Sequence, residues 1–339
     1  MSKQIRTKAE ATEDEAVMEP SIRPKGFDTY IGQRQIIDNL KIAIRSAKVR
    51  NTVLDHVLLH GPAGLGKTSL ANVIANEMGA PLLTLAGPTI KRPGDIVAAL
   101  SNIEEGTVVF IDEIHRMDMM CEETLYSAME DRFVTITIGK DSQTRPIRFE
   151  LPGFTLVGAT TKAGSLSKPL RDRFGLPFKL EYYTEDELER IASATASAYG
   201  ISLGEGCLRK IAAASRGIPR LCNRNVARVR DLVLAKGISR AEEDDTDEAL
   251  RLLGIDRNGL DRTDKLILST LCGSAKPVGL KTLSDILGED DGTIESVYEP
   301  YLISRGYIIK TGRGRMATDK ARTLMGLPPA AGCEQLSLF

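Results

Sequence analysis

The 339-residue chain contains no tryptophan, only 5% aromatic residues and five widely separated cysteines. No two of the cysteines form a C-x-x-C pair, which argues against both a disulfide framework and a zinc site. No apolar run approaches the ~18–20 residues of a membrane-spanning helix, and the N-terminus lacks the pattern of a signal peptide. We therefore expect a cytoplasmic protein with reduced cysteines and no membrane partner.

An excess of charge of one sign is also missing, because 45 Lys and Arg residues nearly balance 46 Asp and Glu residues. Overall charge therefore does not indicate a polyanionic partner, and any contact with nucleic acid must come from local basic patches. The composition, 42% hydrophobic and 27% charged, is that of an ordinary globular protein, and the length predicts two or three domains.

The pattern of the chain predicts an α/β domain between a tail and two smaller domains. Residues 1–20 are polar and acidic and predict a disordered tail. Over residues 21–183, helical patterns alternate with β-branched runs, which predicts a doubly wound parallel sheet. Its expected strands lie near 56–60, 82–86, 107–111 and 154–158.

After Glu181 we expect no further strands until the C-terminal domain. Residues 184–254 predict a small helical lid domain, with helices near 185–199, 205–215, 219–236 and 245–253. Residues 255–326 predict a winged helix, because a Gly-rich hairpin at 307–318 follows helical patterns near 262–272, 279–287 and 291–304. Residues 327–339 would form a flexible tail.

The strongest motif is Gly-Pro-Ala-Gly-Leu-Gly-Lys-Thr at 61–68, directly after a predicted strand and before a predicted helix. This is the P-loop pattern G-x-x-x-x-G-K-T in its proper context. Gly64 and Gly66 would let backbone N–H groups approach phosphate oxygens. Lys67 would reach the β- and γ-phosphates, and the Thr68 hydroxyl would bind Mg²⁺. The motif therefore predicts that the cofactors are ATP and Mg²⁺.

A second apolar strand ends in two carboxylates, Asp112 and Glu113. The carboxyl ends of parallel strands meet at the nucleotide, so Asp112 is placed to hold Mg²⁺ and Glu113 to polarise the attacking water. Thr160 ends the next strand and would help to orient that water. Two adjacent acids indicate turnover of the nucleotide as well as binding.

Two arginine sites lie outside this core. One is Pro-Leu-Arg-Asp-Arg-Phe-Gly at 169–175, and the other is Arg220, which follows Gly217-Ile218-Pro219. The planar guanidinium suits phosphate oxygens, and an arginine finger from a neighbouring subunit can raise a hydrolysis rate by ~10³–10⁵.

Together these motifs resemble the AAA+ ATPases and, within them, the RuvB family of bacterial motors that branch-migrate Holliday junctions. The resemblance covers about residues 21–320. Longer strings carry the closer match, namely Phe110–Arg116, Ala128–Asp131, Gly158–Thr161, Arg216–Arg220, Tyr298–Leu302 and Gly314–Thr318.

The resemblance implies a ring, usually a hexamer, with ATP bound between subunits. Its nucleotide contacts would be Ile22, Arg23 and Tyr183 at the base and ribose, and Gly64, Gly66, Lys67, Thr68 and Ser69 at the phosphates. Glu130, Asp131 and Arg132 would face the neighbouring nucleotide. Arg173 would be the finger in trans, preferred over Arg171 because it directly precedes Phe-Gly, and Arg220 would be the second sensor.

The same resemblance implies the partners. Alternating segments between 133 and 151 predict a protruding hairpin that would receive a RuvA-like junction-binding protein. Lys310, Arg313 and Arg315 in the wing would contact the backbone of duplex DNA, although Lys310 stands where the family usually has arginine. A RuvC-like resolvase is a further implied partner. The resulting motor would pump duplex DNA through Holliday junctions in recombination and repair.

The last five residues, Gln335-Leu336-Ser337-Leu338-Phe339, are unexpected for that family and resemble the pentapeptide with which bacterial proteins bind the sliding clamp. Two other functions stay open at this point. A clamp loader would share the ATP site, but the hairpin and winged helix argue against it. A nucleotide-switched DNA-binding regulator would not need Glu113 or Arg173.

Overall fold

The computed structural model describes residues 22–138, 145–256 and 258–329. The chain divides into two compact units, one made of the residues up to Gly200 together with Gly217–Asn223, and the other of Ile201–Arg216 with the residues from Arg224 onward. The predicted acidic tail and the C-terminal pentapeptide lie outside the described ranges. Within those ranges, no helix is both long enough and apolar enough to cross a membrane.

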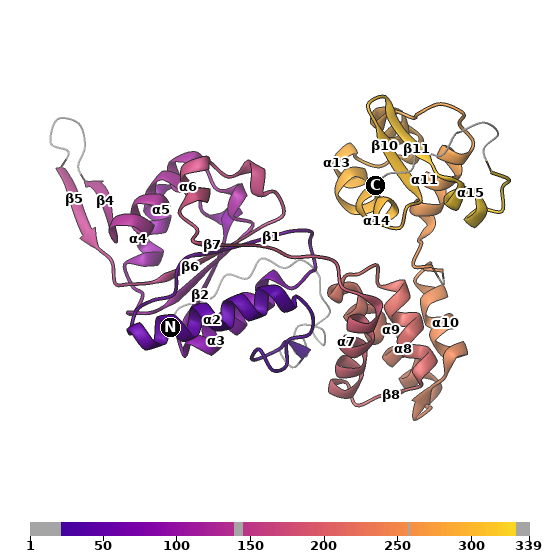
Figure 1. Ribbon diagram of the computed structural model, residues 1–339, viewed down its shortest axis with the longest axis horizontal. Helices are drawn as coiled ribbons and strands as arrows, with labels where there is room; N and C mark the ends of the chain where they lie inside the picture. Colours follow the sequence, from indigo (N-terminus) through magenta and orange to yellow (C-terminus); the bar gives the residue numbers. More distant parts are fainter. Residues whose placement is uncertain (1–21, 139–144, 257, 330–339) are drawn as a thin grey trace. The chain divides into compact units, whose positions relative to one another are not determined.

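The first unit is built on the predicted parallel sheet, which has five strands in the order β2-β3-β6-β1-β7 (Figure 1). Its central strands are buried along almost their whole length, as expected for a sheet covered on both faces. The register pairs His60 with Thr160 and Ile111 with Gly158, so the carboxyl ends of these strands lie side by side. The strands are β1 (Val57–His60), β2 (Leu82–Ala86), β3 (Val108–Asp112), β6 (Thr155–Thr160) and β7 (Leu176–Lys179).

Helices cover both faces of this sheet (Figure 1). On one face lie α2 (Arg34–Arg50) and α3 (Lys67–Met78), and on the other lie α4 (Pro93–Leu100), α5 (Met119–Asp131) and α6 (Lys168–Asp172). The second face forms one apolar core in which Ile111 and Leu156 of the sheet pack with Leu125 of α5 and Leu170 of α6. This doubly wound layering confirms the predicted fold class.

Sequence patterns did not indicate strand β7. It reads Leu-Pro-Phe-Lys, and a proline within a run argues against a central strand. The structure explains the exception, because β7 pairs only with β1 and stands at the edge of the sheet. One side of an edge strand pairs with no neighbouring strand, so a residue without a backbone N–H donor is tolerated there.

The predicted hairpin between 133 and 151 is present. Strand β4 (Phe133–Ile138) pairs antiparallel with β5 (Arg145–Glu150), and the pair extends away from the sheet (Figure 1). At its base the Arg148 guanidinium lies 3.5 Å from the centre of the Phe133 ring. A cation over an aromatic face is attractive, so this contact helps to fix the root of the hairpin.

The predicted lid helices are α7 (Glu185–Ala198) in the first unit, α9 (Pro219–Lys236), which begins there and continues in the second, and α8 (Glu205–Ala214) and α10 (Glu243–Leu252) in the second. The expectation that no strand occurs here was wrong. Two-residue strands β8 (Ser202–Leu203) and β9 (Arg240–Ala241) pair in parallel. Segments this short carry no periodic signal. The four described cysteines are buried, and none of them forms a disulfide.

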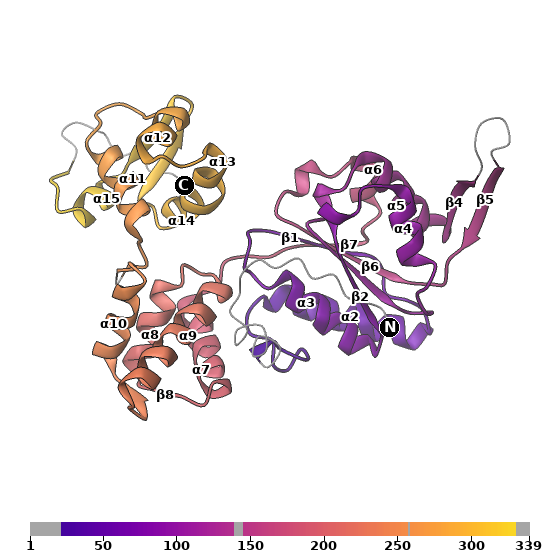
Figure 2. The same ribbon diagram turned by 180° about the vertical axis from the view of Figure 1, so that it is seen from behind.

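The second unit also contains the predicted winged helix (Figure 2). Its elements are α11 (Arg262–Cys272), α12 (Leu280–Leu287), α13 (Asp291–Thr293), a π-helical turn (Ile294–Tyr298), α14 (Glu299–Ser304), strands β10 (Ile308–Thr311) and β11 (Gly314–Ala317), and α15 (Asp319–Leu324). The predicted helix over 291–304 is present, with its middle turn, Ile294–Tyr298, in π form. Pro300 follows that turn and has no backbone N–H, so it cannot donate a hydrogen bond to the preceding turn of the helix.

A buried ion pair supports the wing. The Arg315 side chain is 8% exposed and donates from Nε to Glu299 Oε1 at 2.5 Å, while Glu299 is 2% exposed. Glu295 and Lys310 extend the network at the surface, with Nζ of Lys310 2.9 Å from Glu295 Oε1. Strand β11 is thereby tied to the start of α14.

Replacing Glu299 with alanine should leave the Arg315 guanidinium buried without its main partner. We expect the winged helix to lose about 3–5 kcal/mol of stability, as is typical when one member of a buried pair is removed. Hydrogen exchange of the β10 and β11 amides measures this loss. Glu295→Ala is the control, because Glu295 is half-exposed and should contribute no more than about 1 kcal/mol. Equal effects of the two substitutions would contradict this account.

Candidate nucleotide-binding site

The loop 61–66 joins β1 to α3 and has the shape of a phosphate cradle. Gly64 and Gly66 have φ angles of +81° and +96°, which glycine adopts at little cost. Helix α3 begins at Lys67, so the loop lies at the positive end of that helix. Because backbone N–H groups and a helix N-terminus converge here, the loop is suited to bind an anion.

The side chain of Lys67 folds back over this loop. Its Nζ donates to the carbonyl oxygens of Gly61 and Pro62 at 2.8 and 2.9 Å. Burial lowers the pKa of Lys67, while the carboxylates of Glu113 and Asp112 act in the opposite direction. The ammonium group is therefore held between the loop and the acidic end of β3, where phosphates would lie.

The acidic end of β3 forms a hydrogen-bonded cluster with the end of β6. Glu113 has a left-handed backbone (φ +49°), a strained conformation for a residue with a side chain. Its Oε2 lies 3.2 Å from His115 Nδ1 and accepts a hydrogen bond from the Thr161 hydroxyl at 3.3 Å. Thr160 Oγ1 is 2.9 Å from the same His115 nitrogen.

His115 is the residue of this cluster that sequence reasoning left without a role. The Glu113 carboxylate favours a proton on Nδ1, and the Thr160 hydroxyl lies within hydrogen-bonding distance of the same nitrogen. Burial lowers the pKa of His115, which favours the neutral ring. The His115 ring therefore lies between Glu113 and Thr160 and contacts both through Nδ1. Its position two residues after Glu113 was a sequence signal for the contact with Glu113, but not for the contact with Thr160.

A cavity of about 350 Å³ adjoins the P-loop. Its wall contains Gly66 and Ser69 of the P-loop region, and its apolar side would suit a base and ribose. Tyr183 also lines the cavity, and its hydroxyl donates to the Leu65 carbonyl at 3.2 Å. The remaining walls are Ile22, Arg23, Pro24, Lys25, Thr29, Tyr30, Ile31, Ile191, Ala194, Thr195, Ala198, Pro219 and Asn223.

The segment that opens α9 packs directly on the P-loop. The Arg220 backbone N–H donates to the Gly64 carbonyl at 3.3 Å, and Tyr183 N–H donates to the Gly217 carbonyl at 2.9 Å. A Cβ on Gly64 would lie 2.7 Å from Ile218 Cγ2, so any larger residue would push the two segments apart. The Arg220 side chain is exposed. Nucleotide contacts and the predicted sensor are thereby linked through the backbone.

Arg173 belongs to a different cluster. Its guanidinium donates to Tyr126 Oη at 2.6 Å, pairs with the Glu130 carboxylate, and lies 4.6 Å from the centre of the Tyr126 ring. Arg173 and Arg132 line a cavity of about 210 Å³, and His56 lines the same cavity. Since His56 directly precedes β1 and the P-loop follows it, the two cavities lie toward opposite ends of that strand.

The structure thus gathers most of the predicted nucleotide contacts in two places. Around the P-loop it brings together Ile22, Arg23, Gly64, Gly66, Lys67, Thr68, Ser69, Asp112, Glu113, Thr160, Tyr183 and Arg220. Near the start of β1 it brings together Glu130, Arg132 and Arg173, with Asp131 at the end of the same helix, α5. Tyr126, which sequence reasoning did not select, holds the Arg173 side chain in position.

The wing presents its basic residues unequally. Arg313 is exposed in the turn between β10 and β11, and Lys310 is 49% exposed but paired with Glu295. Arg315 is buried, and its Nε and Nη2 donate to Glu299 and Glu295. A direct contact of Arg315 with DNA does not fit this arrangement, because the side chain is buried and its charge is used internally. The sequence pattern could not show this.

Three family models match the chain: the Holliday junction DNA helicase RuvB P-loop domain over residues 22–180, the RuvB AAA lid domain over 183–256 and the RuvB C-terminal winged helix domain over 257–326. The chain is 49% identical over 321 residues to the Holliday junction branch migration complex subunit RuvB of Lactobacillus helveticus, which covers 94% of this chain and 92% of that relative. The corresponding subunit of Fusobacterium nucleatum is 48% identical over 310 residues, or 91% and 93% of the two chains.

Among solved structures, the Thermotoga maritima RuvB Holliday junction branch migration motor superimposes with a TM-score of 0.81 at 41% identity. The match covers 91% of this chain and 100% of that one. The chain therefore contains a P-loop domain, an AAA lid and a winged helix in that order, and each of them matches the model of the same family. The chain belongs to the RuvB family of P-loop ATPases.

Proposed function

We propose that this chain is the ATP-driven motor that branch-migrates Holliday junctions during recombination and DNA repair in the cytoplasm. The observation that carries the proposal is the P-loop, which lies beside Asp112 and Glu113 in a chain that also contains a winged helix. The relatives named above are branch migration subunits, which supports the same function here.

ATP and Mg²⁺ fit the residues around the P-loop. The cavity beside Ser69 is apolar enough for a base, and the loop offers donors for phosphates. The Thr68 hydroxyl and the Asp112 carboxylate are oxygen ligands of the kind Mg²⁺ prefers, so they would hold the ion. Bound there, Mg²⁺ would neutralise charge on the phosphates.

The remaining groups would act on water and on the γ-phosphate. Glu113 would orient and polarise the attacking water, and the Thr160–His115 contact would fix its carboxylate. Lys67 would stabilise charge that develops on the transferred phosphate. Arg220, at the start of α9, would respond to the bound nucleotide.

A second subunit would complete this site. Arg173, with Glu130, Asp131 and Arg132, lies toward the other end of β1, which supports its action on the nucleotide of a neighbouring copy. Such sharing leads naturally to a closed ring, and we propose a homohexamer. The β4–β5 hairpin would bind a RuvA-like protein, and a RuvC-like resolvase would join the same complex at the junction.

Duplex DNA would meet the wing. Arg313 at its tip and Lys310 beside it carry accessible positive charge, which suits contact with phosphates of any sequence. We assign Arg315 to the support of the wing, through Glu299. A motor that moves along any DNA needs contacts of this backbone type.

The C-terminal pentapeptide Gln335–Phe339 would tether the motor to the sliding clamp. Its Leu336, Leu338 and Phe339 side chains would enter an apolar groove of that protein, as short linear motifs commonly do. This attachment would be additional to branch migration, since the pentapeptide is remote in sequence from the ATP site.

Replacing His115 should slow hydrolysis without weakening ATP binding. We expect His115→Ala to lower the rate of ATP hydrolysis about 10–100-fold, because Glu113 loses its anchor to Thr160. His115→Asn should retain most of the activity, since its amide N–H can stand in for Nδ1–H. Exposed Arg116→Ala is the control. Loss of ATP affinity in parallel with the rate would show that His115 serves binding instead.

Mixing two inactive variants tests whether Arg173 acts in trans. Arg173→Ala and Glu113→Gln should each lower hydrolysis by ~10³ or more when present alone. Mixed rings should recover activity, because some sites then combine Glu113 of one chain with Arg173 of another. Hydrolysis rates at varied mixing ratios measure this recovery. Mixed rings that form but stay inactive would contradict action in trans.

Removing Gln335–Phe339 should abolish capture of the chain by purified sliding clamp while leaving ATP hydrolysis unchanged. A triple alanine variant at Leu336, Leu338 and Phe339 should behave in the same way, because the apolar side chains would supply the binding energy. The measurement is a pull-down with the clamp as bait. Equal capture of the full and shortened chains would remove this part of the proposal.

A further inference from the structure

Arg216 lies at the end of α8 and connects the lid to the winged helix. Its Nε donates to the Gly259 carbonyl at 2.6 Å, and its Nη2 lies 2.5 Å from Asp264 Oδ2 and 3.3 Å from Asp261 Oδ2. The centre of the Tyr301 ring is 4.9 Å from its Cζ. The linker between the lid and the winged helix consists of residues 255, 256 and 258–260 of the described chain. A single side chain thus contacts this linker, the start of α11 and the helix α14.

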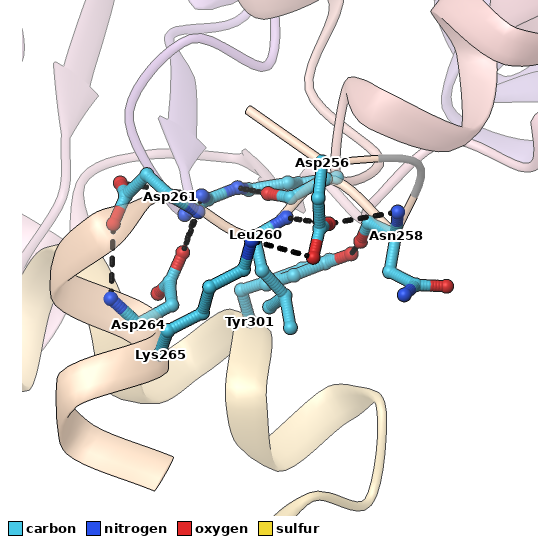
Figure 3. Close-up of polar contacts among 9 residues, drawn as sticks. Asp256, Asn258, Leu260, Asp261, Asp264, Lys265 and Tyr301 are labelled. Carbon is cyan, nitrogen blue, oxygen red and sulfur yellow. Dashed lines mark hydrogen bonds and ion pairs between the residues drawn. The ribbon is translucent and has the colours of Figure 1, made fainter. Parts of the chain in front are cut away.

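The linker that receives Arg216 is tightly folded (Figure 3). The Asp256 carboxylate accepts hydrogen bonds from the backbone N–H groups of Asn258 and Leu260 at 2.9 and 3.0 Å, and it pairs with Lys265 at 3.1 Å. Tyr301 Oη donates to the Asn258 carbonyl at 2.6 Å. The linker is therefore fixed to the winged helix by its own bonds.

The same linker lies directly against the end of α8. Gly259 has a φ of +72°, and a Cβ there would lie 3.2 Å from the carbonyl oxygens of Ala213 and Ala214. Ala214 in turn packs with Leu250 and Ile255. Close backbone contact and a small apolar cluster thus join lid and linker beside the Arg216 side chain.

Burial makes this joint sensitive to the loss of its arginine. The side chain of Asp264 is fully buried, and that of Arg216 is 9% exposed. Desolvation raises the pKa of Asp264 to about 6, and the Arg216 guanidinium opposes that rise. Buried ion pairs contribute little to stability but can specify one geometry. Arg216 also has a left-handed backbone (φ +56°), which its side-chain contacts help to hold.

Arg216 is followed immediately by Gly217–Arg220, the segment that packs on the P-loop. Three residues separate the arginine of the joint from the predicted sensor Arg220. A displacement of this segment when ATP is bound or hydrolysed would act directly on Arg216 through the backbone, as well as on α9. The residue therefore stands in the chain between the nucleotide site and the DNA-binding wing.

We propose that Arg216 is a positioning residue that couples the nucleotide site to the winged helix, by locking the linker and α11 to the end of α8. Movement of Gly217–Arg220 then displaces the wing, whereas without the lock the lid would move and the winged helix would lag. This inference rests on the proposed motor function, but it concerns transmission of movement and not the chemistry of ATP.

The test compares DNA movement with ATP consumption. In the full chain, with a four-way junction and its junction-binding partner, Arg216→Met should keep ATP hydrolysis without DNA within about twofold and lower migration per ATP about tenfold or more. Arg216→Lys should be intermediate, because lysine keeps the charge beside Asp264 but loses the Nε donor. Lys210→Met is the matched control, since Lys210 pairs with Glu243 and Asp247 inside the lid.

Two results would overturn the proposal: unchanged migration per ATP in Arg216→Met, or a loss of hydrolysis that matches the loss of migration. If Arg216→Met does not fold, Asp261→Asn replaces it, because asparagine still caps α11 but lacks the charge. Asp261→Asn should then show the same intermediate loss of migration per ATP as Arg216→Lys. Unchanged migration per ATP in this variant would contradict the proposed joint.

Hydrogen exchange separates this inference from the proposed function. A non-hydrolysable ATP analogue should change the exchange of the Gly259 and Leu260 amides in the wild type and not in Arg216→Met. If wild-type protein moves no junctions, the motor function fails, and this exchange measurement still decides the coupling. An equal response of both proteins to the analogue would overturn it.

Discussion

The shape of the loop 61–66 is the constraint on which the nucleotide site depends. Two of its glycines hold left-handed backbone, which turns the chain tightly enough for α3 to begin at Lys67. The same shape brings Gly64 against Ile218 and lets its carbonyl accept the N–H of Arg220. One loop would therefore position the phosphates, and it also supports the segment that leads to Arg216 and the winged helix.

The parallel sheet determines which groups can share a site. Carboxyl ends of β1, β3 and β6 meet, so Asp112, Glu113 and Thr160 gather beside the P-loop. Arg173 lies with residues that precede β1, and no local rearrangement would bring it around the strand. Under the proposed function, a second copy would therefore supply Arg173 to this site, which would connect the fold to a ring. The buried pairs Arg315–Glu299 and Arg216–Asp264 then fix the wing and its attachment.

Much of this arrangement was predictable, because the P-loop, the acidic strand end and the three-domain order are written in local patterns. Strand β7 escaped because Pro177 suggested a break, and only its edge position makes that proline acceptable. The burial of Arg315 also escaped, since a basic residue in a wing looks the same in sequence whether it faces DNA or Glu299. The role of His115 depends on a contact between β6 and the residues after β3, which no spacing along the chain reveals.

The most direct test of the motor is movement of a synthetic four-way junction by the purified chain with its junction-binding partner, using ATP or a non-hydrolysable analogue. The account predicts steady migration with ATP and none with the analogue, although both support binding to DNA. Migration that proceeds equally with the analogue would contradict a motor driven by hydrolysis. DNA-stimulated hydrolysis without any migration would equally contradict it, and would direct attention to the sliding clamp as the substrate.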